Sequence, residues 1–439
     1  MSESAEQENC RSQGTTVLLG PIAPADPNGP NFNEISGLGV SAQTRALAGG
    51  GTESVIWVVN DSGSGKRFAA FGAQSGVRIK SYRLGVPSSD DYEDLSLGPC
   101  GSAAPSATCV FIADLGDNTA RGSSGAQTGR GTSYIYKFRE PDVSDSSQAD
   151  NYFIPASDIS ILPVNYNDPS SPTQFSDCES LFVDHVGWGA DGAPGDIYFL
   201  TKWNSAQSAN TRLFKYPAAS QPSSFGTTAA SYSAKAVSSA LTGRTWTRAD
   251  MAVSGTLLVL GDYSSVYIFL RCPGTSVADA LALGASGACQ SWSNPSGTDR
   301  TQFETAAFNQ NSSSLIQISE CSSSCQPPIC TTGLTRDTSK SCPATTAAVS
   351  TTTSGPTTSP GPTTSPGPTP SPGPSTTSTS PGPTTTGPTS AATTTANASL
   401  INVAMPNTTE FLAVSAASAL RQTCAAGLMT ALVSLSLWS

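Results

Sequence analysis

The 439-residue sequence predicts an all-β head that folds as a β-propeller of five blades, or of six if its cysteine-rich end forms another blade. A disordered Ser/Thr/Pro stalk and a C-terminal apolar tail are expected to follow the head. The main observation is an acidic residue followed by an apolar run, which recurs five times at intervals of roughly 50–90 residues. Each copy precedes β-rich segments that end in polar residues, as four-stranded propeller blades do.

The strands of each expected blade can be assigned from apolar runs bounded by turn residues. In order along the chain they are 34–39, 55–59, 67–71 and 77–84; 93–97, 109–113, 134–138 and 159–164; 179–183, 196–200, 212–216 and 232–237; 250–253, 256–260, 265–270 and 290–292; and 304–308 and 314–318. The last blade lacks an outer strand, and we expect residues 16–19 to supply it, because pairing strands from both chain ends closes the ring.

Composition divides the chain into an N-terminal segment (1–14), the propeller (15–343), a stalk (344–398) and a C-terminal region (399–439). The stalk is almost only Thr, Ser, Pro, Gly and Ala, which is typical of extended, O-glycosylated segments outside the cell. Sequons at Asn311, Asn397 and Asn407 agree with a glycoprotein.

The C-terminal region has small residues near Ser415, a polar spacer with Arg421, and an uncharged apolar end. This order is the signature of a GPI-anchor signal, so we expect a cell-surface protein attached to the membrane. The alternatives are a poor membrane span and a fortuitous apolar end. Residues 1–9 contain no apolar leader, so we expect the start to be truncated.

Strand order predicts where acidic residues gather. In a four-stranded meander, the first strand begins at the end of the blade where the second strand finishes. The strand-start acids should therefore form an inner ring of metal ligands: Glu34, Glu93, Glu179, Asp250 and Glu304. Oxygen-only ligands suit Ca²⁺. The second-strand endings give a possible ligand face around this ring: Asp61, Asp114, Asp117, Asn118, Lys202, Asn204 and Asp262. The alternative for any single acid is a turn cap.

Other chemistries have little support. The sequence has one histidine, His185, which we expect at the opposite face of the ring. A single histidine excludes His-cluster metal sites and argues against a Ser-His-Asp triad. A formal net charge of −10 without a basic cluster argues against nucleic acid.

The 11 cysteines include Cys424 in the apolar tail, which leaves ten that we expect to form disulfides rather than a zinc site. A disulfide from Cys10 to the cluster 321–342 would join the first and last blades, and Cys100 with Cys109 and Cys272 with Cys289 flank short loops. The pairing itself stays open.

Four segments together resemble secreted microbial β-propellers: residues 33–38, 57–63, 92–95 and 112–118. The wider group includes the phytase-like (esterase-like) propellers, the gluconolactonase-type propellers and the calcium-dependent nucleotidases. The resemblance covers about 32–318 and implies an axial Ca²⁺ held by blade acids. The catalytic His and Asn patterns of the lactonases are not recognisable, so no catalytic residue carries over.

Two function classes follow. The first is a cell-surface, calcium-binding propeller with a ligand-binding or adhesion role, for a small-molecule, glycan or protein ligand and with a monomeric head. The alternative is a calcium-dependent hydrolase of phosphate or carboxylic esters, which leaves open whether the chain is an enzyme. An enzyme should present an open metal position in a polar cleft, and a binding module should present an exposed aromatic patch.

Overall fold

The computed structural model describes residues 9–22, 32–61, 66–87, 91–104, 106–116, 132–166, 177–202, 211–238, 240–241, 243–294, 302–320 and 327–342. The predicted stalk and C-terminal region lie outside the described residues, as do Asp117, Asn118 and Asn204. Within the described ranges, no helix is both long and apolar enough to cross a membrane.

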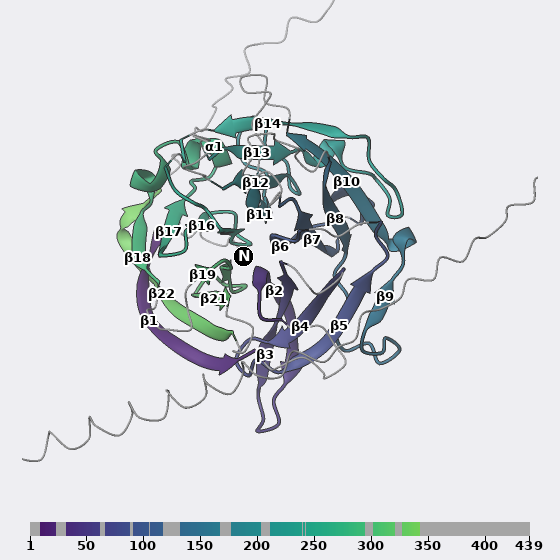
Figure 1. Ribbon diagram of the computed structural model, residues 1–439. Helices are drawn as coiled ribbons and strands as arrows, with labels where there is room; N and C mark the ends of the chain where they lie inside the picture. The colour runs from purple at the N-terminus through teal and green to yellow at the C-terminus, as the bar shows by residue number, and fades with distance from the viewer. Residues whose placement is uncertain are drawn as a thin grey trace, which may run out of the picture. The chain divides into compact units, whose positions relative to one another are not determined.

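The described strands form antiparallel meanders arranged in a ring, which makes the head an all-β, propeller-like domain (Figure 1). The first two meanders are joined by short strand β9 (Tyr152–Ile154), which pairs in parallel with β5. Their strands are β2 (Ile35–Ala46), β3 (Thr52–Asn60), β4 (Arg67–Gly72) and β5 (Arg78–Leu84), then β6 (Asp94–Pro99), β7 (Thr108–Asp114), β8 (Ser133–Arg139) and β10 (Ile159–Tyr166).

The next two meanders follow the same order from the centre outward, and the second of them is linked to short helix α1 (Val277–Ala280). Their strands are β11 (Cys178–Val183), β12 (Ile197–Thr201), β13 (Leu213–Tyr216) and β14 (Tyr232–Ser238), then β15 (Arg248–Met251), β16 (Leu257–Gly261), β17 (Ser265–Leu270) and β18 (Gln290–Ser293). The ends of these strands agree with the predicted segments to within three residues, except that β2 continues seven residues beyond the predicted end at residue 39. The fourth inner strand begins and ends two residues earlier than predicted.

The last meander contains both ends of the described chain. Its inner part is β19 (Gln302–Phe303) and β20 (Ala307–Phe308), followed by β21 (Ser314–Glu320), β22 (Pro328–Ser341) and the N-terminal strand β1 (Asn9–Pro21). The predicted addition of residues 16–19 is confirmed, because β1 pairs antiparallel with β22 at Thr16↔Thr332 and Leu18↔Cys330. Strand β22 was not predicted.

The core lies between the meanders rather than inside any one of them. Trp57 of the first meander and Val110 of the second share one apolar cluster, and Phe71 of the first shares another with Ile316 of the last. Comparable clusters fill the remaining gaps between neighbours. Strands such as β12 are buried along their whole length because sheets cover both faces, which explains their uninterrupted apolar sequence.

Among the residues that the structure describes, three disulfides hold the head together: Cys10–Cys289, Cys100–Cys109 and Cys272–Cys342. Cys100 and Cys109, which flank a short loop and whose pairing the sequence left open, are bonded to each other. The expected bond between Cys10 and the cluster 321–342 is wrong, since Cys10 instead reaches the fourth meander. Cys272 and Cys289 flank a short loop but are not bonded to each other, because Cys272 pairs with Cys342. Disulfides of this kind are consistent with an extracellular protein.

Candidate metal centre

A group of carboxylates lies at the end of the ring where the inner strands begin and the second strands finish. Asp61 follows β3, Glu93 precedes β6, Glu179 lies in β11, and Glu304 lies between β19 and β20. With Lys202, these side chains line a small pocket of about 120 Å³, which Tyr263, Gln302 and Glu320 complete. The predicted meander geometry therefore does bring strand-start acids and second-strand endings together.

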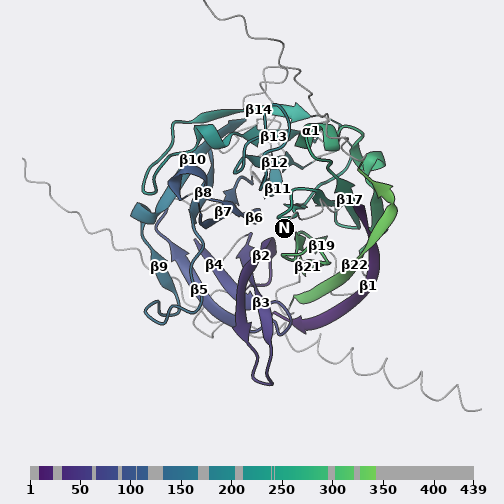
Figure 2. The same ribbon diagram turned by 180° about the vertical axis from the view of Figure 1, so that it is seen from behind.

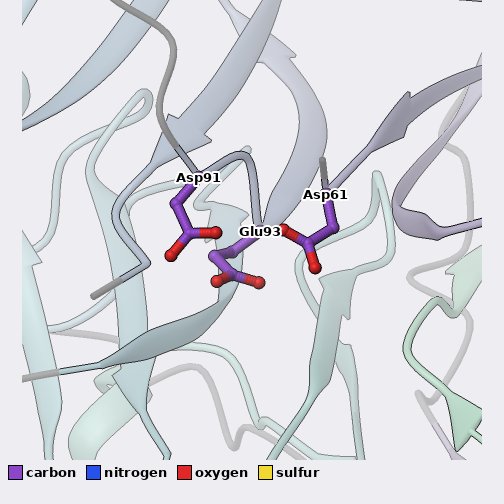
Figure 3. Close-up of side chains that lie close together, drawn as sticks. All are labelled: Asp61, Asp91 and Glu93. Atoms are coloured by element: carbon purple, nitrogen blue, oxygen red, sulfur yellow. The ribbon is translucent and has the colours of Figure 1, made fainter. Parts of the chain in front are cut away.

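Two carboxylate triads form the centre of this group, and both contain Glu93. Asp61, Asp91 and Glu93 offer oxygens that all lie within 4.8 Å of one another, and so do Glu93, Asp177 and Glu179. Figure 3 shows the carboxylates of the first triad turned toward a common space. We call the seven residues that make up this site the carboxylate cluster: Asp61, Asp91, Glu93, Asp177, Glu179, Glu304 and Glu320.

The backbone around Glu93 is fixed by hydrogen bonds from neighbouring strands. The Glu93 amide donates to the Ala113 carbonyl at 2.9 Å. The Asp91 amide donates to Asp114 Oδ1 at 3.1 Å, and the hydroxyl of Tyr136 donates to Asp114 Oδ2 at 3.2 Å. Fully buried Asp114 therefore positions the first triad and is not itself a member of it.

A glycine makes room for these carboxylates. A Cβ on Gly116 would lie 2.0 Å from Glu93 Oε1 and 2.5 Å from Asp91 Oδ2, so a side chain at this position would displace both carboxylates. The Gly-Asp-Asn segment after β7, which the sequence suggests as a turn, thus begins with a residue whose missing side chain leaves room for the first triad.

Burial and mutual repulsion make the cluster unfavourable as a set of anions. Burial, followed by the hydrogen bond and charge of Asp91, raises the pKa of Asp61 to about 8. Burial also raises the pKa of Glu179 and of Glu304 to about 8, and that of Glu93 well above its ordinary value. Like charges close together in a low-dielectric site favour the neutral form unless a cation is present.

One protein cation lies in the pocket among the described residues. The Lys202 ammonium donates a short hydrogen bond to Glu179 Oε1 and lies 5.6 Å from the ring centroid of Tyr263. The charge of Glu179 raises the pKa of Lys202 against the opposing effect of burial. A single ammonium cannot neutralise seven carboxyl groups, so the remaining negative charge calls for protons or a metal ion.

The donor set fits a hard divalent cation. It consists of oxygen atoms only, and Asp61 Oδ1 is buried without a hydrogen-bond partner among the described residues. Ca²⁺ takes six to eight oxygens at about 2.3–2.6 Å, supplied by carboxylates and water. Asp61, Asp91, Glu93, Asp177 and Glu179 are the residues that would hold such an ion.

The predicted site residues divide into three groups. Glu93, Glu179 and Glu304 line the pocket together, with Asp61 and Lys202 from the predicted ligand face. Glu34 belongs to neither triad, although its charge contributes to the raised pKa of Glu320. Asp262 caps a turn, accepting from the amides of Ser264 and Ser265, and pairs with Arg244 at 2.8 Å.

The placement of Asp250 in the same ring is wrong. The amide of Thr247 donates to the Gly261 carbonyl, as the amide of Glu93 does to Ala113, so Thr247 is the equivalent of Glu93. Asp250 therefore lies three positions further along the strand, where it pairs with Val259. It lines a different pocket, of about 100 Å³, together with His185.

Three members of the cluster were not predicted as site residues: Asp91, Asp177 and Glu320. A usable signal for two of them is the repeated Asp-x-Glu spacing, Asp91-Tyr92-Glu93 and Asp177-Cys178-Glu179, at the starts of two inner strands. Glu320 ends the second strand of its meander, where polar endings were expected.

Comparison with known proteins adds little. No protein family matches the sequence, and no curated protein does. Among solved structures, the chain is similar to the PQQ-bound form of aldose sugar dehydrogenase (Adh) from Streptomyces coelicolor, with a TM-score of 0.32 and 12% identity, covering 75% of this chain and 100% of that one. It is also similar to U3-55K, with a TM-score of 0.27 and 7% identity, covering 68% of this chain and 67% of that one. Similarity at this level carries no argument, so the fold assignment rests on strand pairing and core packing.

Proposed function

We propose that the chain is a calcium-binding, five-bladed propeller head displayed at the cell surface, where it binds a ligand or an adhesion partner. The observation that carries the proposal is the pair of carboxylate triads that share Glu93. The five-blade count is supported by the five meanders and the apolar clusters that alternate with them.

Calcium is the ion we favour because of the ligands. Both triads consist of carboxylates and contain neither histidine nor cysteine. Oxygen donors of this kind select Ca²⁺ or Mg²⁺ over zinc. Mg²⁺ requires near-ideal octahedral geometry and usually binds through one or two carboxylates, whereas each triad here offers three carboxylates, which suits the larger ion.

Surface display is supported by composition and by the disulfides. The Ser/Thr/Pro tract would hold the head away from the membrane, and the C-terminal region would supply the glycolipid anchor. The disulfides agree with the oxidising environment that such a location implies.

A calcium-dependent hydrolase is the second candidate. The pocket beside the triads is lined by charged and polar groups, including Lys202 and Tyr263, as an open metal position in an enzyme would require. Its volume of about 120 Å³ lies well below the 300–1,000 Å³ or so of typical organic-ligand sites, so only a phosphate-sized or carboxylate-sized group would enter it.

The test is thermal unfolding of the full chain, produced with its disulfides intact, first in excess EDTA and then with added Ca²⁺ or Mg²⁺. Calcium at about 100 times its Kd should stabilise the folded state by about 2.7 kcal/mol, and Mg²⁺ by much less. No calcium-specific increase in melting temperature would refute the metal site.

Turnover then separates the two candidates. Calcium-dependent hydrolysis of p-nitrophenyl phosphate or p-nitrophenyl acetate, abolished by EDTA, would favour the hydrolase. Calcium binding without turnover of either ester would favour the binding role.

A further inference from the structure

A further cavity lies away from the carboxylate cluster and has no part in the function proposed above. It has a volume of about 450 Å³, within the range of about 300–1,000 Å³ that is usual for organic ligands. Its walls come from the end of β8, the segment between β8 and β9, and β9 itself, which runs along the outer edge of the ring in both views (Figures 1 and 2).

One side of this cavity is aromatic. Tyr152 and Phe225 both line it and both are only partly buried. The Arg139 guanidinium lies 5.7 Å from the centroid of the Phe225 ring, which fixes a positive charge on this wall. An aromatic wall provides an apolar surface for a flat, C–H-bearing face of a ligand.

The cavity is also lined by hydrogen-bond acceptors, and one of them, Glu140, is held in place by two donors. Trp57 Nε1 donates to Glu140 Oε1 at 2.8 Å, and Ser41 donates a short hydrogen bond to the same oxygen. The other oxygen of Glu140 has no hydrogen-bond partner among the described residues. Asp142 and Asp158 line the same cavity and add two more carboxylates.

A further acceptor in the cavity is Gln148 Oε1, which is buried and makes no hydrogen bond within the described part of the chain. A buried acceptor left unpaired costs free energy, so a donor brought by a ligand would remove that cost.

These features define the chemistry of the occupant. The acceptors require a ligand rich in hydroxyl donors, and the aromatic wall requires an apolar face. The three carboxylates exclude an anion, while Arg139 on the aromatic wall opposes a cation. We propose that this cavity is a second ligand site, which binds an uncharged sugar residue independently of the metal centre.

The experiment uses the full chain and a panel of free sugars: glucose, mannose, galactose, N-acetylglucosamine and cellobiose. Saturation-transfer NMR identifies any sugar that binds, and calorimetry then measures its Kd with calcium and with EDTA. We expect at least one sugar to bind, with the same Kd in both conditions. Binding that requires calcium would overturn the proposal, because the ligand would then belong to the carboxylate cluster.

Variants locate the site. Asp158→Asn removes one exposed carboxylate and should weaken binding about tenfold, since a hydrogen bond to a charged group is worth about 1.5–3 kcal/mol. Tyr152→Ala should weaken it further by removing the aromatic surface. The matched control is Phe153→Ala, because Phe153 is the neighbouring residue on the other face of β9, is 46% exposed, and contacts Arg83 instead.

Three further results would overturn the inference. They are no saturation transfer from any sugar in the panel, an unchanged Kd in Asp158→Asn, or binding of lysine and spermidine in place of sugars. Tyr152 also packs against Tyr82, so a loss of folding in Tyr152→Ala is possible, and Asp158→Asn then decides alone.

Discussion

The same inner strands line one pocket where they begin and another where they finish, and the two ends differ in charge. At the beginning, five members of the carboxylate cluster line a pocket of about 120 Å³, and Asp91 and Asp177 lie close to two of them. At the finish, a pocket of about 100 Å³ is lined by apolar residues such as Leu97 and Phe308, with Asp250 and His185 among them.

The difference lies in how negative charge is balanced. Asp250 Oδ2 accepts a hydrogen bond from the Phe308 amide at 2.9 Å, so one carboxyl group is served by the backbone of the next meander. At the other end the carboxylates outnumber the donors that face them, and backbone amides cannot serve them all. A ring of strands can therefore contain single buried acids without help, but a converging set needs a cation.

The largest expected effect concerns the end with His185. Arg271 forms two hydrogen bonds with Asp184, at 2.9 and 3.0 Å, and both side chains are fully buried. Arg271→Met leaves an unpaired buried carboxylate, so it should cost about 3–5 kcal/mol in unfolding by guanidinium, equally with calcium and with EDTA.

The control for that variant is Arg78→Met, which breaks a more exposed pair with Asp150 and should cost about 0–1 kcal/mol. If the cost of Arg271→Met depended on calcium, the two ends would be coupled and the comparison would fail.

The next effect concerns the carboxylate cluster. Glu93→Gln removes the one carboxylate that both triads share, so the stabilisation of about 2.7 kcal/mol by calcium at 100 times the wild-type Kd should largely disappear. Calorimetric titration with calcium measures this directly. Asp279→Asn, which changes an exposed acid at helix α1, should leave calcium binding unchanged; equal affinities in all three proteins would disprove the site.

The dependence of stability on pH should have opposite signs at the two ends. Burial lowers the pKa of His185 to about 4, so between pH 4 and 6.5 the unfolded state binds more protons and stability rises with pH. In EDTA, Asp61, Glu179 and Glu304 have pKa values raised to about 8, so the folded state binds more protons than the unfolded state, and stability falls as pH rises from about 4.5 to about 8.

His185→Gln isolates the contribution of His185 to the dependence of stability on pH. The rise between pH 4 and 6.5 should be smaller in the variant by about 1 kcal/mol, because one pKa unit is worth about 1.4 kcal/mol and the partly exposed ring is screened by solvent. Unfolding by urea at the two pH values measures the difference, and parallel curves for the two proteins would contradict the assignment.

The smallest effect separates a turn cap from a metal ligand. Asp262→Asn loses the ion pair with partly exposed Arg244 but keeps an acceptor for the turn, so the cost in stability should stay below about 1 kcal/mol. Calcium affinity should change less than twofold, whereas Asp61→Asn should weaken it clearly. A large loss of affinity in Asp262→Asn would restore the predicted outer ring.

Most of the strands could be predicted because each is marked in the sequence by its own short run of apolar residues. Val55-Ile56-Trp57-Val58-Val59 lies within β3, and residues 265–270 match β17. Strand β22 was missed because its outer half, rich in Thr, Ser and charged residues, has no apolar alternation and is defined by its pairing with β1.

The candidate site was only partly predictable because it depends on register. The acid-plus-apolar pattern placed Glu93 and Glu179 correctly, but it fits Asp250 equally well, and only the pairing of Asp250 with Val259 shows that this acid lies deeper in its strand. Disulfide partners were less predictable still, because Cys10–Cys289 joins residues 279 positions apart.

The closure of the last meander by β1 has a consequence for synthesis of the chain. Thr16 and Thr332, which face each other across β1 and β22, are separated by 316 positions. At about 5–20 residues per second, the ribosome needs roughly 15–60 s to make the second after the first. For that time the N-terminal strand has no partner, so a nascent head must be kept from pairing with its neighbours until almost the whole domain has emerged.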